Sequence, residues 1–170
     1  RSCSSAASDV YKRQPVPVWL DGMIQEATAI HSSHPEYLTS SLKRSLLQDD
    51  GENPFTSEWF RPVKGRELRE SIIMDTSPCI VLATSGMLNG GPVMEYFKNW
   101  AHEERNSLCF VGYQAEGTLG RRLQKGFGEV PMVINGQTEI VKVGCEMVTI
   151  DGFSGHSDRR QLLEFVDQLH

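Results

Sequence analysis

The sequence predicts an α/β fold built on a parallel sheet with helices on both faces, followed by antiparallel strands. Three observations support this prediction. Short runs that are apolar throughout, such as residues 79–83 and 108–111, are typical of strands buried on both sides. Helical patterns separate these runs, as the crossover between parallel strands requires. After residue 130 the pattern changes to strands that alternate around an Asn135-Gly136 turn.

The first half of the chain is expected to contain two strands and three helices. Short apolar runs favour strands, and apolar residues repeated every three or four positions favour helices. Asp21 stands between the first strand and the first helix, where an acidic side chain is expected to cap the helix. The expected elements, in order, are a strand at residues 16–20, helices at 22–31 and 35–47, a weak strand at 59–63 and a helix at 67–74.

The second half is expected to continue this alternation and then to leave it. The Asn135-Gly136 pair is typical of a tight hairpin turn, so we expect the alternating segment after it to run antiparallel to the strand before it. The expected elements, in order, are a strand at residues 79–83, a helix at 92–102, a strand at 108–111, a helix at 118–125, hairpin strands at 130–134 and 138–150, and a last helix at 159–169.

Composition limits the classes of function. The chain has 170 residues, 39% of them hydrophobic, which is enough for one globular core. Its formal net charge of −5 argues against a large positively charged surface that binds nucleic acid, so a phosphate site would have to be a small, local pocket. The four cysteines are far apart in the sequence, which indicates a reducing, cytoplasmic setting. No apolar stretch approaches the roughly 18 residues of a membrane span, so we expect no membrane contact.

Residues 1–14 differ from the rest of the chain. They are small, polar and aperiodic, and residues 9–14 are similar to the translation of a transposon end used in preparing sequencing libraries. We therefore expect a non-native or disordered leader there. At the other end, the last helical pattern stops at His170 without a cap, which indicates a truncated reading frame.

His156 is the most informative single residue. Glycine and serine stand on both sides of it, which allows a phosphate to approach both the imidazole and the backbone N–H groups. Asp158 is placed to cap the helix that follows. This arrangement makes His156 a candidate general acid, although a lone histidine at such a junction is more often structural.

Two glycine-rich loops follow the buried strands, at residues 83–92 and 111–121. In an open parallel sheet, ligands bind at the carboxyl ends of the strands. Ser85 and Thr118 would add hydroxyl groups there, and Arg121 would add a two-pronged cation. The alternative that these glycines only form tight turns stays open. Neither loop has the spacing of a P-loop or of a dinucleotide-binding motif.

Three stretches carry a resemblance to a known family. They are ATSGMLNGGP at residues 83–92, FVGYQAEGTLGR at 110–121 and GFSGHSDRRQ at 152–161. In this order they resemble the β-CASP nucleases of the metallo-β-lactamase superfamily. The similarity is closest to the archaeal homologues of the cleavage and polyadenylation specificity factor, and it covers about residues 15–170.

The resemblance implies a chemistry and a set of residues. Two zinc ions in the intact protein would hold the water that attacks an RNA phosphodiester. His156 would protonate the leaving oxygen or stabilise its charge. Most of the family's zinc ligands lie before the region of resemblance, and a further histidine ligand is expected after the last helix, beyond His170. We therefore expect this chain to hold no zinc and to be inactive alone. The residues expected to line the RNA phosphate path are Ser85, Gly86, Gly112, Thr118, Gly120, Arg121 and Ser154.

The resemblance also implies a division of the chain and a biological role. Residues 15–150 would form most of a β-CASP domain, and residues 151–170 would begin the return to the metallo-β-lactamase core. The implied function is a ribonuclease of the type that acts in mRNA 3′-end processing or transcription termination. RNA would be the partner, and a homodimer of the intact protein is compatible with it. A non-catalytic RNA-binding scaffold of the same fold is the main alternative, and a mononucleotide-binding domain is a third.

Overall fold

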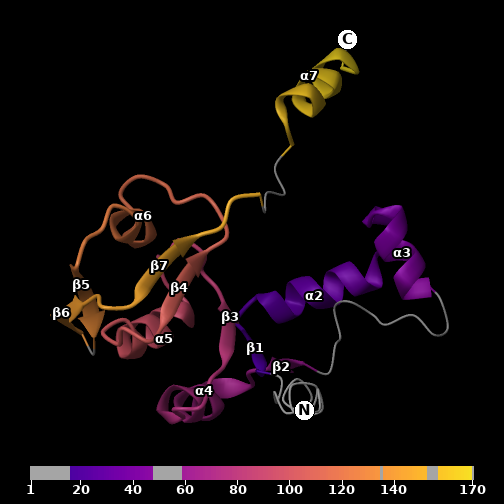
Figure 1. The fold of residues 1–170 in the computed structure, drawn as a ribbon. Coiled ribbons are helices and arrows are strands. Elements are labelled where there is room, and N and C mark those ends of the chain that lie inside the picture. Colours follow the sequence, from indigo (N-terminus) through magenta and orange to yellow (C-terminus); the bar gives the residue numbers. More distant parts are fainter. Residues whose placement is uncertain (1–15, 48–58, 135, 153–156, 170) are drawn as a thin grey trace, which may run out of the picture. The chain divides into compact units, whose positions relative to one another are not determined.

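The computed structural model describes residues 16–47, 59–134, 136–152 and 157–169. The chain divides into two compact units, Arg1–Trp100 and Ala101–His170, which we call unit 1 and unit 2. Figure 1 shows the elements of each unit along the chain. The leader expected at residues 1–14 lies outside the described residues.

Unit 1 contains the parallel sheet that the apolar runs predict. Its strands are β1 (Val18–Asp21), β2 (Phe60–Pro62) and β3 (Ile80–Ala83), in the order β2-β1-β3. Trp19 of the central strand lies opposite Arg61 on one side and Val81 on the other. Both pairings are parallel, so the carboxyl ends of the three strands share one edge. This confirms the parallel α/β class.

The helices of unit 1 follow the predicted pattern with one difference. Residues 35–47 form a short 3₁₀ turn and a separate helix, because Leu38 takes an extended backbone conformation between them. Lys43 N–H then bonds to the Thr39 carbonyl and starts the new helix. The elements are α2 (Ile24–Ser33), η1 (Pro35–Tyr37), α3 (Ser40–Leu47), α4 (Gly65–Met74) and α5 (Val93–Trp100).

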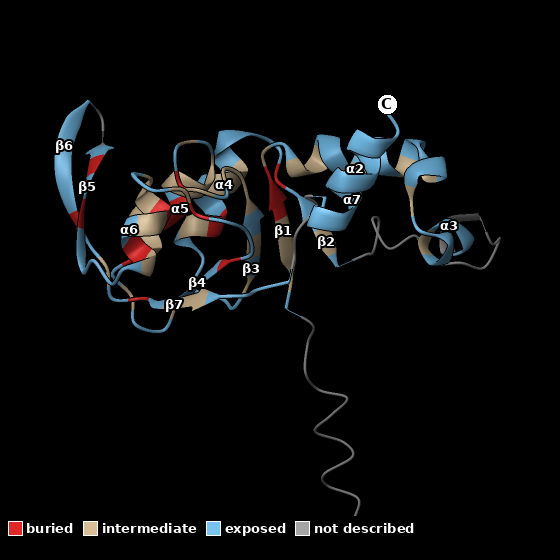
Figure 2. Ribbon diagram, turned by 90° about the horizontal axis from the view of Figure 1, so that it is seen from above, coloured by how far each residue is buried: buried red, intermediate tan, exposed pale blue. Residues whose placement is uncertain are grey.

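The core of unit 1 lies between the sheet, α4 and α5. Val63, Ile72 and Tyr96 form its buried cluster, and β1 and β3 contribute partly buried side chains to it. Figure 2 shows buried residues in β1 and α5. On strand positions that alternate with these, Ile80 and Leu82 are 50% and 42% exposed. In β3, therefore, one face of the strand packs against the core and the other face is exposed.

Unit 2 contains the predicted hairpin. Strands β5 (Glu129–Ile134) and β6 (Gln137–Lys142) pair antiparallel, and Val130 lies opposite Val141 with both side chains buried. Gly136 takes a φ of 79°, the left-handed conformation that a tight turn requires. The remaining elements of unit 2 are β4 (Ser107–Phe110), α6 (Leu119–Gln124), β7 (Glu146–Thr149) and α7 (Arg159–Asp167).

The last strand differs from the prediction. Residues 138–150 do not form one antiparallel segment, because β7 pairs in parallel with β4, with Ser107 opposite Glu146. The chain leaves the hairpin at Gly144, whose backbone N–H bonds to the Ala101 carbonyl at 2.7 Å. A Cβ at Gly144 would lie 2.7 Å from the His102 carbonyl oxygen, so only glycine allows this close approach. The parallel pairing thus returns after the hairpin.

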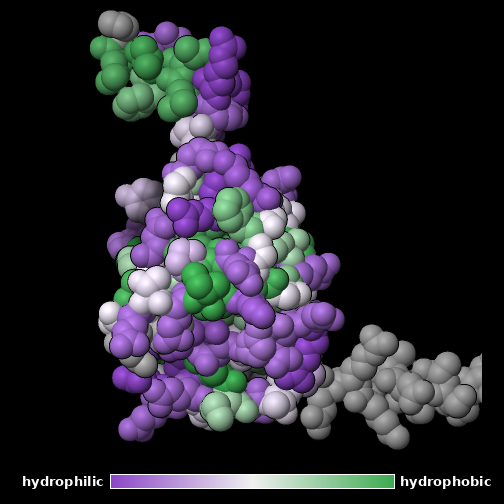
Figure 3. All heavy atoms as spheres, turned by 90° about the vertical axis from the view of Figure 1, so that its left-hand side faces the viewer, coloured by the Kyte–Doolittle hydropathy of each residue, from purple (hydrophilic) through white to green (hydrophobic). Residues whose placement is uncertain are grey.

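Helix α7 begins as the sequence predicts. Asp158 accepts a hydrogen bond from Gln161 N–H at 2.8 Å, and the Gln161 side chain accepts one from Asp158 N–H at 2.9 Å. This reciprocal pair is a capping box. The apolar side chains of α7 are exposed, Leu162 to 55% and Phe165 to 60%, and the apolar side chains of this helix gather on one side of it in Figure 3. None of the described helices is long and apolar enough to cross a membrane.

Candidate functional site

Asp21 occupies the carboxyl end of β1, and its residue is 1% exposed. Arg69 of α4 donates to both carboxylate oxygens, from Nε to Oδ2 at 2.7 Å and from Nη2 to Oδ1 at 2.9 Å. The Tyr96 hydroxyl of α5 donates to Oδ2 at 2.8 Å. The prediction that Asp21 caps α2 is therefore wrong. Met23 is the N-cap residue of that helix, and it makes no side-chain cap bond.

The charges of this network stabilise one another. Burial raises the pKa of Asp21, but hydrogen bonds from Arg69 and Tyr96 outweigh it and place that pKa below its ordinary value. The hydrogen bond to Asp21 raises the pKa of Arg69. Burial, together with the same carboxylate, raises the pKa of Tyr96. At neutral pH the network thus holds a carboxylate, a guanidinium and a protonated phenol, and it ties β1 to both helices of the core.

The loop between β3 and α5 is closed by its own hydrogen bonds. Ser85 N–H donates to the Gly90 carbonyl at 3.1 Å, and Val93 N–H donates to the Thr84 carbonyl at 3.0 Å. Leu88, at the turn of this loop, takes a φ of 56° and is only 2% exposed, so its side chain anchors the loop in the interior. The sequence places this loop at the carboxyl edge of the sheet, and the structure gives it a single defined path.

Ser85 and Gly86 lie in this loop of unit 1. The Ser85 Oγ accepts a hydrogen bond from Asn89 N–H at 3.1 Å, which leaves the hydroxyl proton to donate elsewhere. Gly86 is exposed, and a Cβ built on it would meet no atom within 4 Å. Open space above a glycine lets a ligand approach the backbone closely.

The loop between β4 and α6 belongs to unit 2 and carries the second set of predicted residues. Gly112 is exposed, and a Cβ added to it, as to Gly86, would meet no atom within 4 Å. Thr118 is the N-cap of α6, because its Oγ1 accepts from Arg121 N–H at 3.2 Å. The same hydroxyl donates to the Ala115 carbonyl at 2.7 Å.

Gly120 and Arg121 face different surroundings. Gly120 is buried in α6, where a Cβ would overlap the Gln114 side chain and lie 3.2 Å from the Phe110 ring. Arg121 is 40% exposed, and its Nε donates to Glu116 Oε1 at 3.0 Å. Lys125 donates to the other oxygen of Glu116 at 2.8 Å. Hydrogen bonds from Lys125 and Arg121 lower the pKa of Glu116.

Comparison with known proteins decides the family. A family model described as the Beta-Casp domain matches residues 5–123. The chain belongs to the β-CASP family. A second model, described as the Zn-dependent metallo-hydrolase RNA specificity domain, matches residues 140–170 of this β-CASP chain. The resemblance drawn from the loop sequences is confirmed.

The relatives of this β-CASP chain share one description. The chain is 60% identical over 155 residues to the transcription termination factor FttA of Methanosarcina mazei. It is 53% identical over 154 residues to that of Methanococcus maripaludis, and 55% identical over 155 residues to that of Pyrococcus horikoshii. These matches cover 91%, 90% and 91% of the chain, but only 24% of each relative. The chain thus spans about a quarter of the length of these relatives.

The structure groups the predicted residues of the β-CASP chain in two sets. Ser85 and Gly86 share one loop of unit 1, and residues 112–121 share one loop and helix start of unit 2. Ser154 and His156 lie outside the described residues. Within the described residues, no group of three or more His, Cys, Asp or Glu side chains could hold a metal ion.

Reasoning from the sequence missed the Asp21 network. The one available signal was a carboxylate at the end of an apolar strand, because buried acidic residues are almost always paired. Its partners, Arg69 and Tyr96, lie 48 and 75 positions away, and nothing in their local sequence identifies them. The bridging position of Glu116 between two cations was missed for the same reason.

Proposed function

We propose that this chain is part of a zinc-dependent ribonuclease that acts in transcription termination or mRNA 3′-end processing, and that it forms the cap over the RNA cleft. One observation carries the proposal. The Beta-Casp match and the metallo-hydrolase RNA specificity match follow one another along the same chain. The name of the relatives, transcription termination factor, supports the same role.

The family suggests how the chain divides into domains and which part of the intact protein supplies the zinc. We propose residues 15–150 as the β-CASP domain and residues 151–170 as the start of the returning metallo-β-lactamase core. Two zinc ions of the intact protein would supply the activated water. The resemblance places the zinc ligands outside this stretch of the family's sequence, so the proposal for this chain concerns RNA binding and proton transfer. We propose that the intact protein is cytoplasmic and binds RNA. A homodimer of the intact protein is compatible with this role.

Each of the two loops is proposed to contact the RNA backbone. No atom lies within 4 Å of a Cβ built on Gly86 or Gly112, and this open space would let an RNA phosphate approach the backbone closely. Ser85 would add a hydroxyl donor, and Arg121 would add a positive charge. Thr118 would line the same path, and its hydroxyl would first have to release the Ala115 carbonyl in order to donate to a phosphate. Gly120 supports this path by packing, because its missing Cβ lets α6 approach Gln114. Ser154, which lies outside the described residues, is proposed to contact the RNA as well.

His156 is proposed to donate a proton to the departing oxygen of the cleaved phosphodiester. The experiment is His156→Ala in the full-length protein. Cleavage of a labelled RNA should fall by about 10²-fold or more, the usual contribution of a positioned acid, while zinc content stays constant. The matched control is His102→Ala, since His102 is exposed and pairs with its neighbour Glu103. Loss of zinc in the His156 variant would contradict the proposed role.

The scaffold alternative keeps the same fold and the same RNA contacts without cleavage. The glycine-rich loops support it as well as they support the nuclease, whereas His156 favours the nuclease because a scaffold has no use for a proton donor. The same experiment separates them. A full-length protein that binds RNA, binds zinc and cleaves nothing is a scaffold, and a mononucleotide-binding domain would instead bind a nucleotide at micromolar concentration.

A further inference from the structure

Glu116 bridges two cations in unit 2. Its two carboxylate oxygens accept separately, Oε1 from Arg121 at 3.0 Å and Oε2 from Lys125 at 2.8 Å. Arg121 lies in α6 and Lys125, four positions later, is the C-cap residue of that helix, a spacing at which two like charges repel each other. An anion between them removes this repulsion. The structure thus defines a position between two cations that an anion with two oxygens fills.

This position belongs to a fixed part of the fold. Arg121 Nη1 also donates to the Gln124 side chain at 3.4 Å, and Gln124 donates to Thr149 Oγ1 at 3.1 Å. Thr149 ends β7 and lies opposite Phe110, the last residue of β4. Arg121 is therefore linked to the carboxyl edge of a parallel strand pair, the edge at which α/β proteins bind ligands.

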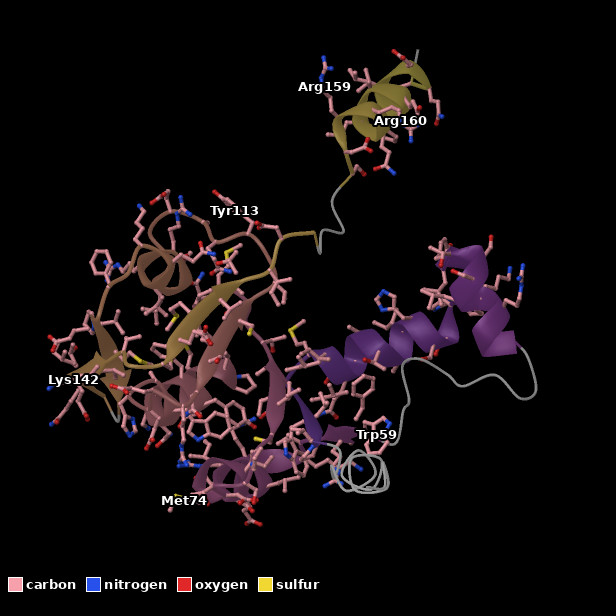
Figure 4. The ribbon with its side chains drawn as sticks, viewed as in Figure 1. Trp59, Met74, Tyr113, Lys142, Arg159 and Arg160 are labelled. Carbon is pink, nitrogen blue, oxygen red and sulfur yellow. The ribbon has the colours of Figure 1, made fainter. Side chains whose placement is uncertain are left out.

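The position is also open to solvent. The side chains of Arg121, Lys125 and Glu116 are 40%, 50% and 65% exposed. Exposed ion pairs of this kind contribute little to folding, so they are readily exchanged for another partner. Tyr113 is 72% exposed and projects outward from the loop that leads to α6 (Figure 4). An exposed aromatic ring on the loop that leads to a cation pair is typical of surfaces that bind single-stranded nucleic acid.

We propose that Arg121 and Lys125 form a binding site for an RNA phosphate, and that Glu116 occupies this site in the free protein and leaves it when RNA binds. A phosphodiester, like a carboxylate, presents two anionic oxygens on one atom. Glu116 would then make the site selective, because only an anion that contacts both Arg121 and Lys125 more favourably than Glu116 does can displace it. This inference rests on the proposed RNA-binding function and adds a regulated contact to it.

The test uses Glu116→Gln in the full-length protein, with zinc withheld so that RNA is bound and not cut. Affinity for a fluorescein-labelled oligouridylate is measured by anisotropy at several salt concentrations. Glu70→Gln is the matched control, because Glu70 also forms an exposed ion pair with an arginine, Arg66 of α4, and the change in net charge is the same. Arg121→Gln combined with Lys125→Gln removes the proposed site.

Glu116→Gln and the double variant are expected to change the affinity for RNA in opposite directions. Glu116→Gln should tighten RNA binding by about threefold to tenfold, the range expected when exposed ion pairs are released. It should also steepen the dependence of log K on log salt by about 0.7 for each additional phosphate that the protein neutralises. The double variant should weaken binding and flatten that dependence, and Glu70→Gln should change neither.

Two outcomes overturn the inference, and they are distinguishable from failure of the proposed function. If RNA binds the wild type but Glu116→Gln behaves like Glu70→Gln, Glu116 does not compete with RNA and only this inference falls. The same holds if the double variant binds RNA as well as the wild type. If the wild type binds no RNA at all, the proposed function falls and this inference falls with it.

Discussion

Arg69 holds both carboxylate oxygens of Asp21, although the two residues are 48 positions apart in the chain. The bond joins the end of β1 to α4, and Tyr96 joins the same carboxylate to α5. Asp21 is also next to the loop between β3 and α5, since its backbone carbonyl accepts from Thr84 N–H at 3.4 Å. The buried ion pair therefore stands where the core of unit 1 meets its candidate binding loop.

Replacement of Asp21 by asparagine should destabilise unit 1 by about 2 to 3 kcal/mol, because it leaves the Arg69 charge without its anion. Urea unfolding followed by tryptophan fluorescence measures this directly. All three tryptophans, Trp19, Trp59 and Trp100, belong to unit 1, so the signal reports that unit alone.

Two controls accompany that variant. Tyr96→Phe removes one hydrogen bond of the network and should cost about 1 kcal/mol. Glu70→Gln breaks an exposed ion pair of α4 with Arg66 and should leave the unfolding midpoint unchanged. An Asp21→Asn protein as stable as Tyr96→Phe would show that the two-pronged contact with Arg69 contributes nothing.

The Asp21 pair should also make stability depend on pH. The pKa of Asp21 is lowered in the folded state, so its contribution is present above the unfolded pKa of about 3.9 and is lost as pH falls through the folded pKa. The difference in unfolding free energy between wild type and Asp21→Asn should be largest at neutral pH and should shrink below about pH 4. A difference that stays constant from neutral pH down to acid would contradict this assignment.

Two glycines of the first loop should respond differently to alanine. Gly91 has a φ of 76°, and a Cβ there would lie 2.7 Å from the Thr84 carbonyl oxygen, so Gly91→Ala should cost on the order of 2 kcal/mol. Gly86→Ala meets no atom and should leave stability unchanged, yet it should weaken RNA binding if phosphate approaches there. Unfolding and anisotropy measurements on both variants separate these effects. Equal stability losses would refute the distinction.

Gly120→Ala should destabilise unit 2. Alanine is better than glycine in a helix by about 1 kcal/mol, but overpacking against Gln114 and Phe110 costs on the order of 2 kcal/mol. The net loss should appear as faster hydrogen exchange of the β4 backbone amides. Gly128→Ala is the control in the same unit, because no atom lies within 4 Å of a Cβ there. Slower exchange in the Gly120 variant would show that Gln114 moves aside at no cost.

Local patterns in the sequence predicted most elements and their type. The apolar run at residues 79–83 became β3, and the Asn-Gly turn became the hairpin of β5 and β6. Both features are decided by neighbours in the chain, which is why they can be read from it. The break at Leu38 within one helical pattern was not predicted, because a single extended residue leaves the apolar spacing almost unchanged.

Long-range pairing could not be predicted in the same way. The segment that forms β7 alternates like a hairpin strand, and only the close approach of Gly144 to His102 redirects it to pair with β4. The positions of Ser85 and Arg121 at carboxyl strand ends follow from the parallel topology. The contact of Arg121 with Glu116 does not, because it depends on how the loop folds back over α6.

The pairing of β4 with β7 has a consequence for synthesis on the ribosome. Ser107 is made 39 residues before its hydrogen-bonded neighbour Glu146, and the entire β5–β6 hairpin is made in between. A nascent β4 thus waits with an open edge, which favours contact with other nascent chains. Translation that stalls within this interval should yield polypeptides that aggregate, whereas stalling after Thr149 should yield far fewer.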